Sequence, residues 1–217
     1  MKVIAINGGP RKEWNTATLL RYALDGVTSK GGDTKLVHLY DLGYKGCYSC
    51  FACKLKDGKS YGRCAINDDL KPILEEIAEA DALILGAPIY FGSITGQMRS
   101  FLERLAFPYL KYDPEHSSLF KRKLLTAWIS PMNIPETMLP EFGYDATFKA
   151  LESLLKRIFG HCEFLPVTDT LQFDDYSKYD VSLFDPAAKK CRREEVFPTD
   201  CKKAFDLGAR FAGGGVE

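Results

Sequence analysis

A chain of 217 residues with 46% hydrophobic residues can bury a sizeable core, and we predict one domain over residues 1–217. Its 29 basic and 29 acidic residues cancel, which excludes a global field that would attract nucleic acid or an anionic membrane. Met1 and Lys2 lead directly into an apolar run, and no stretch has the length needed to cross a bilayer. We therefore expect a cytoplasmic protein without a nucleic-acid or membrane partner.

Residues 1–17 combine an apolar run, a tight loop and a helix start. Residues 3–6 predict a short buried strand, residues 7–10 break it, and Asn15 and Thr16 offer a cap to the helix that follows. The first amides of a helix have no partner inside it and carry partial positive charge, so a phosphate is a natural ligand. Side chains that could add donors are Arg11, Asn15, Thr16 and Thr18. The alternative is an ordinary surface turn with a capped helix.

The rest of the chain alternates strand and helix patterns. Further strands are predicted at residues 34–40, 82–87, 124–129 and 164–171. Apolar residues at helical spacing predict helices over residues 19–27, 70–78, 98–105 and 148–158, with a closing helix at about 200–212. Asp68 and Asp69 are expected to cap the second of these helices. Five strands alternating with five helices predict an α/β fold, a doubly wound parallel sheet in three layers.

Ligands of such sheets bind beyond the carboxyl ends of the strands, so the loops after the first, third and fourth strands are the candidate site. The first loop lacks the spaced glycines of a dinucleotide fingerprint and the Gly-Lys-Ser/Thr of a nucleoside triphosphatase, which favours a mononucleotide phosphate. The loop over residues 88–96 offers Tyr90, Phe91 and backbone amides to a flat heteroaromatic ring. The alternative is that both aromatic residues belong to the core.

Two pairs of segments resemble the flavin loops of the flavodoxin-like NAD(P)H-dependent FMN reductases. They are NGGPR at residues 7–11 with NTA at 15–17, and GAPIYFGS at 86–93 with QMRSF at 97–101. The resemblance implies strand order 2-1-3-4-5, FMN as cofactor, NAD(P)H as co-substrate and a homodimer or homotetramer. The residues that it implies for FMN are Pro10, Arg11, Asn15, Thr16 and Ala17 around the phosphate, Pro88, Ile89, Tyr90, Phe91, Gly92 and Ser93 around the ring, and Ser130 after the fourth strand.

A cysteine-rich insertion at about residues 44–67 has neither helical nor strand periodicity. Cys47, Cys50 and Cys53 are spaced so that one loop can present three thiolates to a cluster, and Cys64 can close the cage. The motif resembles that of the iron-sulfur flavoproteins, a branch of the same family, and implies a [4Fe-4S] cluster on these four residues. The alternatives are free or reversibly oxidised thiols, or a bound zinc ion.

These features predict an FMN-dependent oxidoreductase that takes electrons from NADH or NADPH. Its acceptor would be a quinone, a free flavin, a nitroaromatic compound or an iron-sulfur partner. Because the flavin carries the chemistry, no catalytic side chain is required, and we assign no such role to His38, His116 or His161. The alternatives are a non-enzymatic electron carrier of the flavodoxin type, and a thiol or metal sensor whose cysteine insertion switches an interface.

Overall fold

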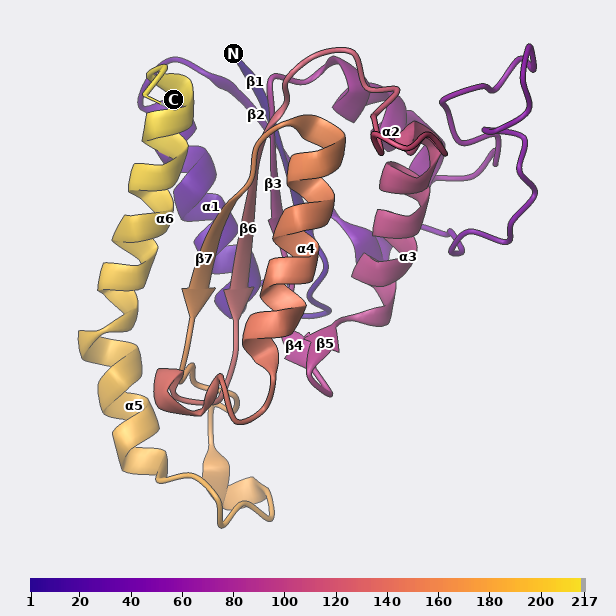
Figure 1. Cartoon of the computed structure of the whole chain (residues 1–217). Coiled ribbons are helices and arrows are strands. Elements are labelled where there is room, and N and C mark those ends of the chain that lie inside the picture. Colours follow the sequence, from indigo (N-terminus) through magenta and orange to yellow (C-terminus); the bar gives the residue numbers. More distant parts are fainter. Residues whose placement is uncertain (216–217) are drawn as a thin grey trace.

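A computed structural model describes residues 1–215 of the chain, and Figure 1 shows a central sheet with helices on both faces. The strands of this sheet are β1 (Lys2–Asn7), β2 (Asp33–His38), β3 (Ala82–Gly86), β6 (Leu125–Pro131) and β7 (Glu163–Val167). All neighbouring strands are parallel, and their spatial order is β2-β1-β3-β6-β7. Numbered along the chain, this is the order 2-1-3-4-5, which confirms the doubly wound, flavodoxin-like α/β fold.

The middle of the sheet is apolar because both of its faces are covered. Every residue of β3 is buried, and so are residues 3–7 of β1 and 126–131 of β6. Successive side chains of a strand point to opposite faces, so Ile4 and Val3 enter different cores. This double coverage explains why these strands are almost wholly hydrophobic rather than alternating, with Thr126 and Ser130 as the polar residues of β6.

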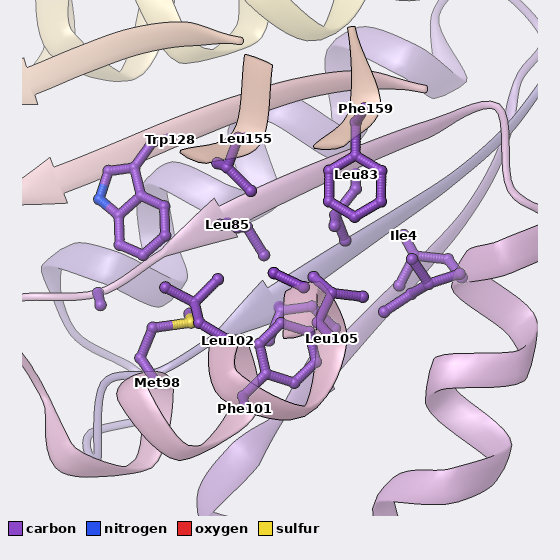
Figure 2. Packing of buried hydrophobic residues seen from close by; sticks show 14 of the residues in the cluster. Ile4, Leu83, Leu85, Met98, Phe101, Leu102, Leu105, Trp128, Leu155 and Phe159 are labelled. Carbon is purple, nitrogen blue, oxygen red and sulfur yellow. The ribbon is translucent and has the colours of Figure 1, made fainter. Parts of the chain in front are cut away.

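Two layers of helices form the two cores. The helices are α1 (Asn15–Thr28), α2 (Leu70–Glu79), α3 (Gly96–Ala106), α4 (Tyr144–Phe159), α5 (Pro186–Glu195) and α6 (Phe197–Ala212). Helices α2, α3 and α4 pack on one face of the sheet, where Figure 2 shows Phe101 of α3 and Leu155 of α4 beside Trp128 and Leu83 of the strands. Helices α1 and α6 cover the opposite face.

Helices α1 and α6 pack closely through two glycines. A Cβ at Gly26 would lie 2.0 Å from the carbonyl oxygen of Phe205, and one at Gly208 would lie 1.8 Å from that of Ala23. The backbones of the two helices therefore touch where neither has a side chain. This contact fixes α1, and with it the loop between β1 and α1.

Several element boundaries differ from the predicted ones. Strand β2 ends at His38 because residues 39–41 form a 3-10 turn, and β7 ends at Val167 because Asp169 has a left-handed φ of 54°. The closing helix begins earlier than predicted, at Phe197, and α5 before it was not predicted at all. Three further 3-10 turns lie at Phe107–Tyr109, Glu136–Met138 and Tyr176–Lys178.

The start of α2 differs slightly from the predicted double cap. The Asp68 carboxylate accepts the N–H of Leu70 at 3.1 Å, whereas Asp69 accepts the N–H of Gly43 at 2.8 Å. Asp69 therefore anchors the cysteine-rich segment rather than the helix. Within residues 1–215, no helix is long and apolar enough to pass through a bilayer.

Candidate functional site

A cavity of about 160 Å³ lies at the carboxyl ends of β1, β3, β6 and β7. Four loops line it, through residues 9–11 and 14–16, 88–90, 131–133 and 170–172. The first three loops are those that the sequence predicted, and the fourth follows β7. The doubly wound topology accounts for this convergence, because the carboxyl ends of parallel strands meet at one edge of the sheet.

The loop between β1 and α1 is held in place by side chains of the sheet and of the N-cap of α3. The Asn7 carboxamide oxygen accepts the N–H of Gly9 at 2.9 Å, which leaves its Nδ2 to donate to His38 Nδ1, also at 2.9 Å. Thr95, the N-cap of α3, donates its hydroxyl to the carbonyl of Gly8 at 2.7 Å. The loop is therefore a fixed platform, and the start of α1 opens directly into the cavity.

The prediction that Asn15 and Thr16 cap α1 is wrong. Both lie inside the first turn, the N-cap is Trp14, and within the described part of the chain its side chain makes no capping hydrogen bond. The Asn15 carboxamide is instead engaged elsewhere, donating to the carbonyl of Leu171 at 2.9 Å and accepting from Arg193 at 2.7 Å. The first amides of α1 are thus left for an anion.

Arg11 lies over the entrance of this helix. Its guanidinium carbon is 4.4 Å from the ring centroid of Trp14, and its Nη1 donates to the carbonyl of Gln172 at 2.7 Å. Burial lowers the pKa of Arg11, as expected of a cation that has lost part of its water. Arg11, Asn15 and Thr16 line the cavity, while Ala17 is buried behind them in the helix.

The loop after β3 contains a small β-hairpin, which the sequence analysis did not predict. Strands β4 (Ile89–Tyr90) and β5 (Ser93–Ile94) pair antiparallel, and Phe91 and Gly92 turn between them with φ of 50° and 72°. A two-residue turn with both φ values positive matches the twist of a hairpin. The alternative that Tyr90 and Phe91 belong to the core is wrong, since both are exposed.

The cavity receives only part of this hairpin. Pro88, Ile89 and Tyr90 line it, whereas Phe91 and Gly92 form the turn beyond its rim and Ser93 begins β5. The structure therefore separates the predicted ring-binding segment into a wall and an exposed tip.

The loop after β6 contributes differently from the prediction. Ser130 is completely buried and donates its hydroxyl to the carbonyl of Ala87 at 3.0 Å, so it braces the cavity from behind. The lining comes from Pro131, Met132 and Asn133 instead. Sequence reasoning assigned no role here to Asn133, although its place directly after a strand was a signal that could have identified it.

Two polar atoms of the lining residues are buried without a partner among residues 1–215. They are the indole Nε1 of Trp14, a donor, and the carboxamide Oδ1 of Asn133, an acceptor. A buried polar group without a hydrogen bond is costly, so each of these atoms marks a place for a ligand atom. A flat heterocycle with polar edges, joined to a phosphate at the start of α1, suits this donor and acceptor set.

The cysteine insertion lies along the other end of α3. Cys47, Cys50, Cys53 and Cys64 line one small cavity together with Phe51, Arg104 and Phe107, and all seven cysteines of the chain are free. Burial raises the pKa of the Cys53 thiol, and Arg104 Nε donates to the Cys64 sulfur at 3.2 Å. Over the described residues 1–215, no three His, Cys, Asp or Glu side chains form a group that could hold a metal ion. The four thiols share a cavity without forming a metal cage.

Comparison with known proteins supports the flavin interpretation of the first site. The family model for NADPH-dependent FMN reductase matches residues 1–132. An iron-sulfur flavoprotein of Methanocaldococcus jannaschii is 40% identical over 104 residues, which are 48% of this chain and 51% of the relative. One from Methanosarcina thermophila is 32% identical over 104 residues, 48% of this chain and 52% of the relative. The chain thus spans about half the length of the curated relatives it matches.

Solved structures share the whole fold at low sequence identity. An NAD(P)H:quinone oxidoreductase from Methanothermobacter marburgensis has a TM-score of 0.71 at 14% identity, covering 96% of this chain and 98% of its own. An FMN-dependent NADH-azoreductase from Bacillus anthracis, solved with FMN, has a TM-score of 0.65 at 14% identity, covering 98% and 100%. Because the family model spans more than half of the sequence, the chain belongs to the NADPH-dependent FMN reductase family.

Proposed function

We propose that the chain is an FMN-dependent oxidoreductase that takes electrons from NADH or NADPH and passes them to a small acceptor, a quinone, flavin or nitroaromatic compound, or to an iron-sulfur partner. One observation carries the proposal: the uncapped start of α1 and the wall of the β4–β5 hairpin face the same cavity. The first suits a phosphate, and the second suits a flat ring. The family membership and the FMN-bound azoreductase of the same fold support it.

The chain's own residues would divide the binding of FMN between the loops. The amides of residues 15–17, with the side chains of Arg11 and Thr16 and the turn at Pro10, would hold the phosphate. Residues 88–90 would flank the ring, and Gly92 and Ser93 would fix the hairpin turn that positions them. The free donor of Trp14 and the free acceptor of Asn133 would meet polar atoms of the cofactor.

When bound, FMN supplies the acceptance of a hydride from nicotinamide and its release as electrons to the acceptor. The protein orients the co-substrate and excludes water from one side of the cavity. Tyr90 and Phe91 are exposed at the hairpin, where a flat nicotinamide or aromatic acceptor would arrive. Ser130 would act indirectly, by bracing the loops through Ala87.

Flavin binding tests this proposal directly. The purified protein should quench FMN fluorescence with micromolar or tighter affinity, and the loaded protein should bleach anaerobically with NADH or NADPH. Arg11→Gln should weaken FMN binding about 10-fold through loss of a charge-assisted hydrogen bond. Arg210→Gln, an exposed arginine whose ion-pair partner is Glu163 on β7, is the matched control and should bind FMN normally. Absence of FMN binding by the wild-type protein would refute the proposal, and flavin reduction without steady-state NAD(P)H oxidation would favour a carrier.

We also propose that Cys47, Cys50, Cys53 and Cys64 hold a [4Fe-4S] cluster. The four thiols already share one cavity, they are the donors that such clusters require, and relatives at 40% identity are named iron-sulfur flavoproteins. Because a cluster binds thiolates, loading would have to deprotonate these residues and draw them together. The loop between them has left-handed turns at Ser49 and Phe51.

Anaerobic purification with iron and sulfide analysis tests the cluster. Cys50→Ser should lose iron and keep its FMN affinity, whereas Cys191→Ser, outside the insertion, should retain both. Equal iron in the wild-type and Cys50→Ser proteins would contradict the assignment. Size-exclusion chromatography of the same preparations tests the expected homodimer or homotetramer, and fractionation of cells tests the cytoplasmic location.

A further inference from the structure

A second arginine reaches the start of α1 from the far end of the chain. Arg193, on α5, donates its Nη1 to the Asn15 carboxamide oxygen at 2.7 Å, and its guanidinium carbon lies 5.9 Å from the ring centroid of Trp14. Arg11 approaches the same indole at 4.4 Å. Figure 1 shows α5 extending from α6 toward the sheet edge where β6 and β7 end. Two guanidinium groups thus converge on one helix start.

Neither of these cations has a carboxylate within 4.0 Å among the described residues 1–215. The adjacent Arg192, in contrast, is paired with Asp200 at 2.6 Å. Burial lowers the pKa of both Arg11 and Arg193, and the more distant carboxylate of Asp174 opposes this shift in both without reversing it. Arg11 is exposed and Arg193 is half-buried, so a bound anion would add an ion pair to each of them, and the positive end of α1 adds to the same field.

Arg193 is held in this place by contacts that do not use up its donors. Its guanidinium stacks on Phe197 at 4.0 Å, which orients the planar group, and one N–H goes to Asn15. A guanidinium has five N–H donors, so donors remain that match the oxygens of a phosphate. Arg193 lines a neighbouring cavity, together with Asp174 and Glu194, which meets the flavin cavity at Leu171. A phosphomonoester carries close to two negative charges at neutral pH, which is the charge that two guanidinium groups can balance.

We propose that Arg193 is a second phosphate-binding residue of the flavin site, supplied by helix α5 near the C-terminal end of the chain, and that it selects a phosphorylated flavin over riboflavin. The inference rests on the proposed function and adds a residue outside the part that the family model matches, residues 1–132. Arg193 also couples the two ends of the chain, because it holds Asn15 in the first turn of α1.

The test compares FMN and riboflavin as ligands of the same variants. Arg193→Gln should weaken FMN binding about 10- to 100-fold, the range for losing hydrogen bonds to a charged group, and leave riboflavin within about twofold. Arg193→Lys keeps the charge but loses the planar pair of donors, so its FMN affinity should lie between those of the wild type and Arg193→Gln. Lys190→Gln on the same helix removes an exposed cation whose ion-pair partner is Glu194 at 4.0 Å, and should change neither affinity.

Each contrary result overturns a distinct statement. Equal weakening of both flavins by Arg193→Gln would show that Arg193 only supports the loop, and unchanged FMN affinity would show that it does not bind phosphate. A wild-type protein that binds riboflavin as tightly as FMN would refute the selectivity but leave flavin binding intact, whereas one that binds neither would refute the proposed function itself. Inorganic phosphate should weaken the apparent affinity of the wild-type protein for FMN but not its affinity for riboflavin. This measurement needs no variant.

Discussion

Replacement of Arg104 by methionine should cost the protein a large part of its stability. Arg104 lies in the last turns of α3, and none of its side chain is exposed. It donates from Nη2 and Nη1 to the two carboxylate oxygens of Asp68 at 2.9 and 2.5 Å, from Nη1 to the carbonyl of Lys45 at 3.1 Å, and from Nε to the sulfur of Cys64 at 3.2 Å. One side chain thus ties both ends of the cysteine insertion to the helix.

The size of the expected stability loss follows from the Asp68 charge, which Arg104→Met would leave without its partner. Burial alone would raise the pKa of Asp68, but the hydrogen bonds and charge of Arg104 outweigh it and hold this pKa below its ordinary value. The Asp68 side chain is 18% exposed, so water would recover only part of the lost interaction. Breaking a buried pair costs about 3–5 kcal/mol, and we expect about 3 kcal/mol here, against a total stability of about 5–15 kcal/mol.

Urea unfolding followed by circular dichroism measures this loss. Arg99→Met, an exposed position on the same helix, is the control and should stay within about 0.5 kcal/mol of the wild type. Arg104→Met combined with Asp68→Asn should cost less than the sum of the two single changes, because neither charge is then left alone. A loss below about 1 kcal/mol for Arg104→Met, or strict additivity in the double variant, would refute the reasoning.

Two further predictions concern the contacts of the β1–α1 unit, one with β2 and one with α6. Burial lowers the pKa of His38, whose neutral Nδ1 accepts from Asn7, so its contribution to stability is present above its unfolded pKa and is lost as the pH falls below about 6.5. The unfolding free energy should therefore decrease from about pH 7.5 to 5.5, and His38→Gln should reduce that slope in urea titrations. The remaining slope comes from His161, whose pKa burial also lowers; an unchanged slope would contradict this prediction. Gly208→Ala should cost about 1–3 kcal/mol in thermal or urea unfolding, since its Cβ would lie 1.8 Å from the Ala23 carbonyl oxygen. The control is Gly96→Ala, whose Cβ meets nothing within 4 Å and which should be nearly neutral. Equal losses in the two variants would show that α1 and α6 can separate freely.

The sheet could be predicted because each strand carries its own identifying pattern within a few consecutive residues. Strands β1, β3 and β6 are covered on both faces, so residues 3–6 and 82–85 are apolar without a break, and Thr126 is the one polar residue within residues 125–129 of β6. Helix α5 could not be predicted, because Lys189 is its one buried residue and no apolar stripe runs along it. That lysine is buried through contacts with the Asn133 carbonyl and the Asp169 carboxylate, partners from distant loops that no local pattern contains.

The part of the site that follows directly from the strand order could also be predicted from the sequence. Residues 9–16 and 88–90 follow strands whose carboxyl ends share an edge, so topology alone brought them together. Trp14 and Asn133 are different, because their importance lies in buried polar atoms without partners, which only the packed structure reveals. Arg193 is the extreme case, since it meets Asn15 across 178 positions of sequence.

Helix α3 relates the two candidate centres to each other. Its N-cap, Thr95, holds Gly8 of the phosphate loop, and Arg104 near its other end holds Cys64 of the insertion. Its 11 residues span about 16 Å, so the two sets of contacts share a rigid element but no side chain. A change at either end therefore leaves the other set of contacts in place. Flavin binding and thiol chemistry should consequently respond to separate substitutions, coupled only through the stability of the helix that both require.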